Sequence, residues 1–588
     1  MSSGITLKQG KPPKAFWKNF ANHYRSMGAP EGYAERRSRQ WKEDPDIITY
    51  GAKKGSEEFG WIIYHPHRST IEEILVEENW AGKGMEAAMV DALISRESLV
   101  SSEILKEDTE KYTWMVAYGF RPTRFFASQG FEFVKMDLST TVFLRKVTGQ
   151  RPSREYPEKE RVVLERVPPT RSHREIKASL RHVLDALGGL EKFLKKGQTV
   201  VIKPNVVADH GLRNGVYSGG IVTDLGLLKA LIEILLPIAK KVIVAEGASI
   251  NRAETMKLFA HYGYDSLTDI DPAKVDLVDL NTDRLVEKVV PGGKRMLSRK
   301  IPQTLEDADV IINLPVMKTH FAAVASLAIK NLQGAIPPLE KYMTHYFGLW
   351  QNLINIHHLV KPKLVIIDGL TAQEDFGPVY GSPKTMNLII GGTNAVAVDA
   401  VTMRIMGLDP VLSPPVKLAY MQGLGPVEPE MITTVGASIK EVRSPFKQPV
   451  INMKGGHQFV VHDDNACPGC RGYLHYVLHK LRRPDPKNPG SLLIDRPFRQ
   501  KVNVFLGPVT ETVPNPEERN IFLGICQQHN AGAGQHLAGC PPHAEVIMKG
   551  IFSLYPDVER PQYADENAED ALEEMLKELL EEESTSFP

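Results

Sequence analysis

The stretch DVIINLPVMKTH, residues 309–320, decides the fold of the largest part of this chain. It is a short apolar run that is followed at once by polar and basic residues. Four similar runs lie elsewhere in the sequence: TVVIKPN (199–205), KVIVAEG (241–247), KLVIIDG (363–369) and NLIIGG (387–392). Continuous apolar strands of this kind are typical of a parallel sheet that is covered on both faces.

Helical patterns separate or follow these runs. LGLLKALIEILLPIAK (225–240) and NAVAVDAVTMRIMG (394–407) repeat their apolar residues with the spacing of an α-helix. Alternating strands and helices predict an α/β fold, with a largely parallel, doubly wound sheet over residues 161–445.

The 588-residue chain is too long for one hydrophobic core, and its composition suggests further segments. Residues 1–148 mix strand and helix patterns and predict an α+β domain. GQRPSREYPEKE (149–160) is polar and contains prolines, as linkers do. Residues 446–560 predict a small cysteine-containing domain. Residues 561–588 predict an acidic amphipathic helix that packs on the body of the protein or binds a partner.

The charge balance argues against two classes of partner. Lysine plus arginine and aspartate plus glutamate both number 71, so no overall field favours nucleic acid or a membrane surface. No run approaches the roughly 18 apolar residues of a membrane helix, and the N-terminus lacks the apolar stretch of a secretory signal. We therefore expect a cytoplasmic protein, whose oligomeric state the sequence does not predict.

Polar residues follow the predicted strands, where the ligands of open α/β sheets bind. The residues at these strand ends are Lys203, Asn205, Glu246, Lys318, His320 and Asp368. Three lysines (Lys203, Lys318 and Lys330) suggest an anionic small-molecule ligand, such as a phosphate or a carboxylate. Each residue taken alone is more often a cap or a member of an ion pair, so the prediction depends on their convergence.

The acidic and imidazole groups of this region allow several roles. Glu246, Asp368 and Asp399 balance the lysines or hold a divalent cation. His320 is the candidate for proton transfer or for ligand binding. We take His320, Lys318 and Asp368 as the candidate catalytic residues.

Six motifs of this region follow, in order, the pattern of a known family. They are IKPNVV, TDLG, NLPVMKTH, IKNLQG, IDGLTAQEDFGPVYG and AVAVDAVTMRIMG. Residues 200–407 thereby resemble the domain-of-unknown-function family numbered 362, many of whose members look like iron–sulfur proteins. The resemblance implies an architecture and no particular reaction. Its motif positions are Lys203, Asn205, Lys318, His320, Lys330, Asn331, Asp368, Gly377, Pro378 and Asp399.

The first domain resembles the GNAT N-acetyltransferase family. ILVEENW (74–80), the turn AGKGM and the next helix match its acetyl-CoA-binding segment, and RFFASQGFEF (124–133) matches a later helix and strand. The resemblance implies that Gly82 and Gly84 shape a turn whose amides hold pyrophosphate. Glu86 would repel those phosphates, so the alternative is a retained fold that docks a partner or senses a ligand.

All four cysteines lie after residue 466, which is unusual for scattered structural thiols. Cys467 and Cys470 form a CxxC pair, and Cys526 and Cys540 form a wider pair. Two thiolates two residues apart can bind one centre from a single turn, and four complete a tetrahedral set. The sequence predicts a metal site here. An iron–sulfur cluster (4Fe–4S) is favoured over zinc because structural zinc sites usually show two tight pairs.

Other interpretations of the cysteines and of the whole chain stay open. The cysteines form a redox dithiol if a helix begins after Cys470, or they are unligated thiols. The leading function is a redox-linked iron–sulfur protein, an oxidoreductase that binds an anionic small molecule and exchanges electrons with a partner. One alternative is an N-acyltransferase that uses acetyl-CoA in the first domain. The other is a zinc-stabilised scaffold or sensor without catalytic activity.

Overall fold

The computed structural model describes residues 4–26, 33–66, 70–80, 83–102, 112–117, 131–136, 141–148, 159–208, 212–213, 216–217, 219–248, 255–290, 298–463, 466–507 and 512–561. The chain divides into two compact units, the first around residues 1–155 and the second over residues 156–420 and 424–568. The predicted α/β core and the cysteine-containing segment therefore lie in one unit. The predicted C-terminal helix and most of the predicted linker lie outside the described residues.

The first unit contains a seven-stranded sheet. Its strands, in spatial order, are β1 (Ile5–Gln9), β2 (Ile48–Lys54), β3 (Glu57–His65), β4 (Thr70–Val76), β5 (Tyr112–Ala117), β7 (Thr141–Thr148) and β6 (Phe131–Met136). Its helices are α1 (Lys14–Ser26), α2 (Tyr33–Glu43) and α3 (Met85–Ser102). Strand β4 pairs in parallel with β5, and the other neighbours in this sheet run antiparallel.

The alternation of side chains along β3 explains how this sheet is covered. Ile62 packs with Val90 of α3 in one buried cluster. Trp61 and Ile63, from the other face of the same strand, pack with Phe20 of α1 in a second cluster. Successive residues of a strand point to opposite faces, so one strand contributes to both cores. This part of the chain is α+β, as predicted.

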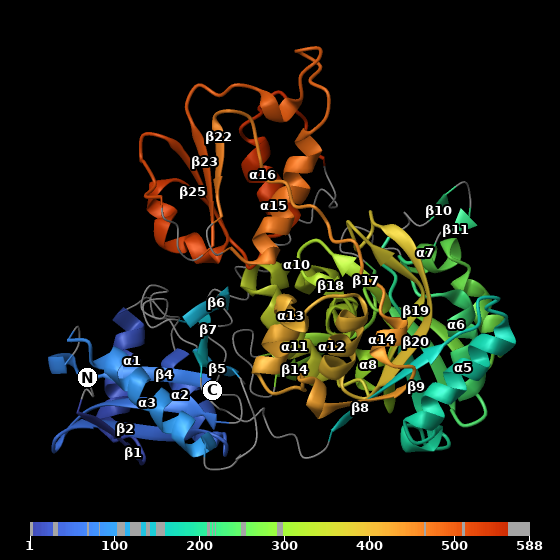
Figure 1. The fold of residues 1–588 in the computed structure, drawn as a ribbon, viewed down its shortest axis with the longest axis horizontal. Coiled ribbons are helices and arrows are strands. Elements are labelled where there is room, and N and C mark those ends of the chain that lie inside the picture. The colour runs from blue at the N-terminus through green and yellow to red at the C-terminus, as the bar shows by residue number, and fades with distance from the viewer. Residues whose placement is uncertain are drawn as a thin grey trace. The chain divides into compact units, whose positions relative to one another are not determined.

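The second unit is built on a mixed, largely parallel sheet (Figure 1). Its main path is β13 (Val275–Asp279), β12 (Lys241–Glu246), β9 (Thr199–Lys203), β16 (Val310–Asn313), β19 (Leu364–Glu374), β20 (Ser382–Gly392), β8 (Glu160–Arg166) and β21 (Ile432–Gly436). Strand β20 runs antiparallel to both of its neighbours, and the other adjacent strands on this path run parallel. The fold class is the α/β class that the sequence predicts.

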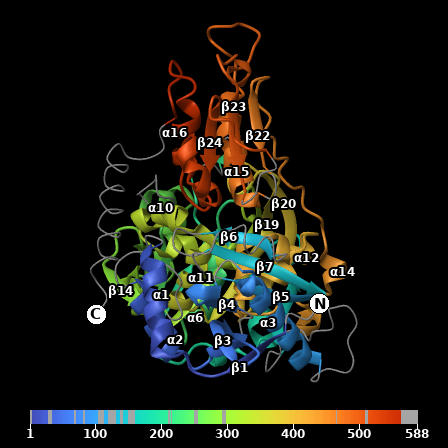
Figure 2. The same cartoon turned by 90° about the vertical axis from the view of Figure 1, so that its left-hand side faces the viewer.

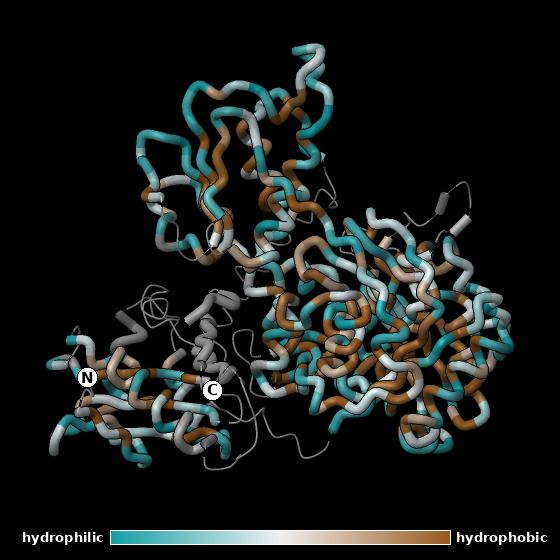
Figure 3. The backbone as a smooth tube through the Cα atoms, viewed as in Figure 1, coloured by the Kyte–Doolittle hydropathy of each residue, from teal (hydrophilic) through white to brown (hydrophobic). Residues whose placement is uncertain are grey.

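Helices cover both faces of this sheet. They include α5 (His173–Ala186), α6 (Leu225–Leu235), α7 (Thr255–His261), α8 (Gln303–Glu306), α9 (Ala328–Asn331), α10 (Pro338–Phe347), α11 (Leu349–Val360), α12 (Ala395–Ile405), α13 (Pro414–Met421) and α14 (Ile439–Val442). Val200 and Ile202 of β9 pack on the side of α5 and α6, whereas Val201 packs on the side of α11. The interior strands are accordingly among the most hydrophobic parts of the chain (Figure 3).

The stretch that decides the fold forms two strands rather than one. Strand β16 ends at Asn313, and β17 (Val316–His320) begins two residues beyond Leu314 and pairs with β18 (Val324–Ser326) and with β19. Pro315 lies at the break, where it contributes no N–H to a ladder. Two short ribbons, β10 (Leu212–Arg213) with β11 (Val216–Tyr217) and β14 (Leu285–Val289) with β15 (Ser298–Pro302), are separate from the main sheet.

The cysteine-containing segment adds a small parallel sheet. Its strands are β22 (Phe459–His462), β23 (Val502–Leu506), β24 (Arg519–Leu523) and β25 (Gln535–Leu537). Helices α15 (Pro468–Leu481) and α16 (Ala544–Phe552) contact each other, and both lie alongside this sheet in two perpendicular views (Figures 1 and 2). Among the described residues, none of the helices has the length and apolarity needed to cross a bilayer.

Candidate functional site

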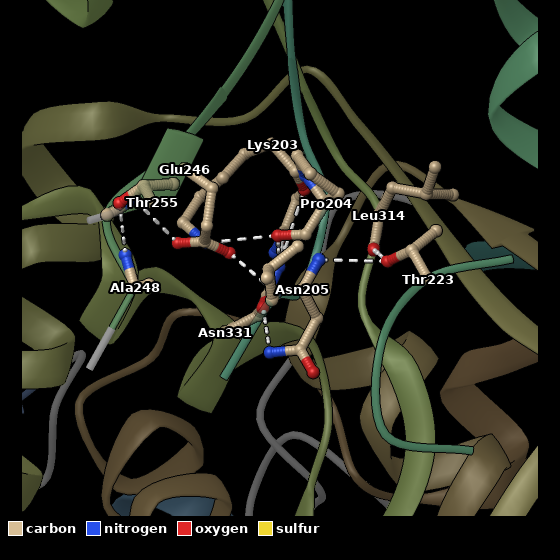
Figure 4. Close-up of polar contacts among 12 residues, drawn as sticks. Lys203, Pro204, Asn205, Thr223, Glu246, Ala248, Thr255, Leu314 and Asn331 are labelled. Atoms are coloured by element: carbon tan, nitrogen blue, oxygen red, sulfur yellow. Dashed lines mark hydrogen bonds and ion pairs between the residues drawn. The ribbon is translucent and has the colours of Figure 1, made fainter. Parts of the chain in front are cut away.

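Buried polar residues at the ends of β9 and β12 form one hydrogen-bonded network (Figure 4). The ammonium of Lys203 lies 2.9 Å from each carboxylate oxygen of Glu246. Asn205 donates to Asn331 Oδ1 over 3.0 Å, and Asn331 donates to Pro204 O over 3.2 Å. We call Lys203, Asn205, Glu246 and Asn331 the interior network.

The interior network is closely packed around Glu246. A Cβ at Gly334 would lie only 1.9 Å from Glu246 Oε1, so the close approach of the backbone requires glycine there. Lys203 is 0% exposed and Glu246 is 2% exposed. Burial lowers the pKa of Lys203 and raises the pKa of Glu246, and the attraction between the two opposes both shifts. Each charge is therefore retained in the interior because its partner is present.

Lys318 belongs beside this network. Its ammonium donates to Asn205 Oδ1 over 2.5 Å and to Ile221 O over 3.0 Å. Burial, and then the charge of Lys330, lowers the pKa of Lys318 to about 7. The side chain thus holds the network and the segment that follows Gly220 together.

A cavity of about 220 Å³ opens next to the network. The core contributes Asn205, Glu246, His320, Lys330, Asn331, Lys341 and His345 to its wall, and the cysteine-containing segment contributes Tyr473 and His543. The rings of His345 and Tyr473 meet edge to face with their centroids 5.3 Å apart. The centroids of the His345 and His543 rings are 5.0 Å apart. One cavity is therefore enclosed by two segments that are distant in the sequence.

His320 presents a neutral imidazole to this cavity. Its Nδ1 accepts hydrogen bonds from the backbone N–H groups of Ala322 (3.0 Å) and Ala323 (3.2 Å). A nitrogen that accepts carries no proton, so the proton of the neutral ring is on Nε2. Burial and the charges of Lys330 and Lys318 hold the pKa of His320 well below its usual value. His320 is thus a hydrogen-bond donor through Nε2.

The two other histidines of the wall are also neutral. His543 begins α16, and its Nδ1 accepts from the N–H of Glu545 over 3.4 Å. Burial lowers the pKa of His543 to about 4. His345 Nδ1 lies 3.2 Å from Pro541 O, which can only accept, so this nitrogen of His345 carries the proton. The wall therefore offers imidazoles whose tautomers are set by the backbone.

The two lysines of the wall differ in what their ammonium groups contact. Lys341 donates to Gly247 O (2.7 Å), Ala248 O (2.9 Å) and Asn281 Oδ1 (2.6 Å), which uses all three of its protons. Within the described part of the chain, the ammonium of Lys330 has no hydrogen-bond or ion-pair partner. Burial, and then the charge of Lys203, lowers the pKa of Lys330 to about 8. Lys330 is thus the cation that the cavity leaves available to a ligand.

The four cysteines come together beside this cavity. Cys467 directly precedes α15, Cys470 lies in its first turn, and Cys526 lies in a 3-10 segment over Ile525–Ala533. A Cβ at Gly524 would be 3.0 Å from Cys470 Sγ, so the two segments touch. A hydrogen bond with Cys467, burial, and the charges of the other three cysteines raise the pKa of Cys470.

Cys540 connects the sulfur site to the cavity wall. Its N–H donates to His345 O over 2.7 Å, and its carbonyl accepts from the N–H of Leu349 over 2.8 Å. No three of the four sulfur atoms, all of which belong to described residues, lie within 4.8 Å of one another. The charges of Cys526 and Cys540 both act on the Cys470 thiol, so the two pairs of cysteines lie near each other.

Comparison with known proteins identifies the core of the second unit. Residues 200–404 match the family described as Domain of unknown function (DUF362). These matched residues are called the DUF362 domain below. The family assignment is the one that the motifs between IKPNVV and AVAVDAVTMRIMG predict.

One curated relative is similar to about half of the chain. The protein called Thylakoid-associated protein sll1697, from Synechocystis sp., is 27% identical over 284 residues, which cover 47% of this chain and 84% of that protein. Two solved structures are similar in part. The lactate racemase apoprotein of Thermoanaerobacterium thermosaccharolyticum is 13% identical, covers 47% of this chain and 62% of its own, and has a TM-score of 0.28.

The second similar structure concerns the N-terminal part of the chain. An acetyltransferase of Thermus thermophilus is 20% identical over 25% of this chain and 99% of its own, with a TM-score of 0.19. At these scores neither structure contributes to the argument about the site. The DUF362 domain is interpreted below from its own contacts.

Two acidic residues of the DUF362 domain do not lie in the cavity wall. Strand β19 continues for six residues past Asp368, so the prediction that this residue ends a strand is wrong. Its carboxylate accepts from the N–H groups of Asp224 (2.7 Å) and Leu370 (3.0 Å). Burial, and then the charge of Asp224, raises the pKa of Asp368 to about 7. Asp368 joins the start of α6 to the sheet.

Asp399 has an equivalent role at α9. Its carboxylate accepts from the N–H groups of Ala328 (2.8 Å) and Ile329 (3.1 Å), which begin the helix that carries Lys330 and Asn331. Burial raises the pKa of Asp399 to about 7. Asp399 therefore positions Lys330 and does not reach the cavity.

The predicted acetyl-CoA site in the first unit is only partly described. Gly82 lies outside the described residues. Gly84 has a φ of +75°, which favours glycine, and it directly precedes α3. Glu86 lies in the first turn of that helix, where its charge would meet a phosphate. Acetyl-CoA binding stays a prediction.

Among the wall residues that the sequence did not predict, two lie on the same helix. Lys341 and His345 lie one turn apart on α10, in the segment PLEKYMTHYF. A polar pair four residues apart on a helix usually faces solvent. Both are buried here, at 2% and 6% exposure, because Lys341 packs on the end of β12 and the Cys540–Pro541 segment covers His345. No local pattern marks that covering.

Proposed function

We propose that this protein is an iron–sulfur protein that binds an anionic small molecule in the cavity beside its cluster. Cys467, Cys470, Cys526 and Cys540 would hold the cluster. One observation carries the proposal: Tyr473 and His543, which follow two of the cysteines by three residues, line the cavity that Lys330 also lines. The centre and the ligand would thus share a wall.

The chemistry of the donor set supports a cluster over zinc. The four thiols come together near the start of α15, and Cys526 and Cys540 lack the tight spacing that is usual in structural zinc sites. The thiolates that bind the four irons of a cluster are farther apart than the ligands of a single ion, and four thiolates are its usual ligands. A bound cluster would supply one-electron transfer to or from a partner. Reduced thiols suit a cytoplasmic location, which we include in the proposal.

The charges of the cavity support an anion and oppose a divalent cation. Lys203 and Lys318 surround the wall together with Lys330 and Lys341, while Glu246 is the acidic residue in the wall. The charges of Lys330 and Lys318 disfavour protonation of His320, which would add a further positive charge to the wall. Lys330 would bind the anion, and His320 would donate to it through Nε2–H. Of the two roles predicted for the acidic groups, this proposal takes the first, in which they balance the lysines, over the binding of a divalent cation.

The proposal is tested on protein purified without oxygen. A cluster gives broad visible absorption that bleaches on reduction, and we expect Cys526→Ser to lose most of this absorption. His536→Asn is the matched control, because His536 Nε2 contacts Gly524 O over 3.1 Å and belongs to the same segment without being a proposed ligand. Colourless protein that contains one zinc ion per chain would refute the redox role and leave the scaffold alternative.

A further inference from the structure

Trp350 carries a buried hydrogen-bond donor without an acceptor. The side chain, on α11, is 0% exposed. Its indole Nε1 has no hydrogen-bond partner among the residues that the structure describes. The indole nitrogen can only donate, so no rearrangement of its own proton can satisfy it. Buried donors of this kind are rare and point to a missing partner.

The indole edge that carries this nitrogen faces the cysteines. A Cβ at Gly469, between Cys467 and Cys470, would lie 3.2 Å from Trp350 Cζ2 and 3.2 Å from Pro541 Cγ. Cζ2 is bonded to the carbon that carries Nε1, so the two atoms share one edge of the ring. The indole and the Pro541 ring therefore both lie against the CxxC turn at Gly469.

The backbone fixes this position. The N–H of Leu349, the residue before Trp350, donates to Cys540 O over 2.8 Å. A side chain at Gly469 would be tightly packed against the indole and the proline ring. The backbone beside Trp350 is thus tied to Cys540, and its ring lies against the CxxC turn.

We propose that the Nε1–H of Trp350 donates a hydrogen bond to a sulfur atom of the centre that the four cysteines hold. The inference rests on the proposed iron–sulfur function. Sulfur of a thiolate or sulfide accepts hydrogen bonds, and such bonds help set the reduction potential of a cluster. Reduction adds negative charge to the cluster, so a donor on its sulfur stabilises the reduced form more than the oxidised form. Trp350 is a positioning residue that raises the potential.

The test compares the reduction potentials of the intact protein and Trp350→Phe, measured by anaerobic redox titration. Phenylalanine keeps an aromatic ring and removes the N–H. We expect the variant to retain its iron and sulfide and to favour the oxidised form by roughly tenfold, about 59 mV for a one-electron couple. Trp61→Phe, in the core of the first unit, is the control and leaves the potential unchanged.

The outcomes distinguish a failure of this inference from a failure of the proposed function on which it rests. A wild-type protein without iron and sulfide refutes the proposed function. A variant with a full cluster and an unchanged potential refutes only the role of Trp350. If Trp350→Phe does not fold, wild-type protein with ¹⁵N-labelled indole nitrogens gives the answer. Magnetic coupling between one indole nitrogen or its proton and the reduced cluster supports the bond, and no coupling to any indole overturns it.

Discussion

The interior network and the cavity wall share Asn205, Glu246 and Asn331, yet the remaining groups of the two regions differ in one respect. Lys203 has both oxygens of Glu246 as partners, and the amide of Asn331 is engaged on both of its ends. Lys330 and the Nε2 of His320 face the cavity with their hydrogen-bonding capacity available. Buried charge alone therefore does not mark a binding site in this protein. A buried polar group marks a candidate binding site where its hydrogen-bonding capacity is unused.

The largest effect should come from breaking the interior network. Glu246→Gln removes the charge that compensates Lys203 while keeping the shape of the side chain. Removing one partner of a buried ion pair costs about 3–5 kcal/mol of the free energy of unfolding. Glu233→Gln, at the partly exposed pair with Lys177, is the matched control and should cost less than about 1 kcal/mol. If urea unfolding shows that both variants lose the same free energy of unfolding, the interior network is not a structural unit.

A change in the cavity wall should act on binding and leave stability alone. Lys330→Met removes an ammonium that has no protein partner among the described residues, so we expect an unchanged free energy of unfolding. Acetate and inorganic phosphate serve as probe anions in calorimetry. We expect whichever binds the wild type to bind at least about tenfold more weakly to the variant, which corresponds to about 1.4 kcal/mol.

The pH dependence of binding sharpens this prediction. Lys330 attracts an anion only while it is protonated, and its pKa is about 8. Anion affinity should therefore be constant below about pH 7 and fall as the pH rises through 8. Lys195→Met, an exposed lysine, is the control for general charge effects. If Lys330→Met loses stability but keeps its anion affinity, Lys330 has a structural role and does not bind the anion.

A further pH-dependent effect concerns Asp399, which supports the wall from behind. Its pKa is about 7 in the folded protein and about 3.9 in an unfolded chain. The folded state therefore binds more protons between these values, and this contribution to stability is lost as the pH rises from about 4 to 7. Asp399→Asn removes the titration. The difference in unfolding free energy between wild type and variant should shrink over this range, and a constant difference would contradict the assignment.

Strand ends were predictable from the sequence because apolar runs terminate in polar residues. That pattern located Lys203, Asn205, Glu246 and His320 at one edge of the sheet, and the structure brings them together. The pattern could not predict which of Lys330 and Lys318 is available to a ligand, since both are lysines near a strand or helix end. The difference lies in whether Asn205 and Ile221 supply acceptors, which depends on the folded chain.

Contacts between distant segments were the part that the sequence could not predict. His345 lies on a helix of the core, and its exposure depends on the Cys540–Pro541 segment almost 200 residues later. Strand β19 likewise continues past Asp368 because β20 pairs with it there, although a glycine follows at once. Pairing across the sheet outweighed the local signal for a strand end.

The central claim is that the four cysteines together hold one iron–sulfur centre. Iron and acid-labile sulfide, measured per chain in anaerobically prepared protein, test it most directly. We predict about four of each per chain, the stoichiometry of a four-thiolate cluster. Protein that contains neither iron nor sulfide under these conditions would contradict the account.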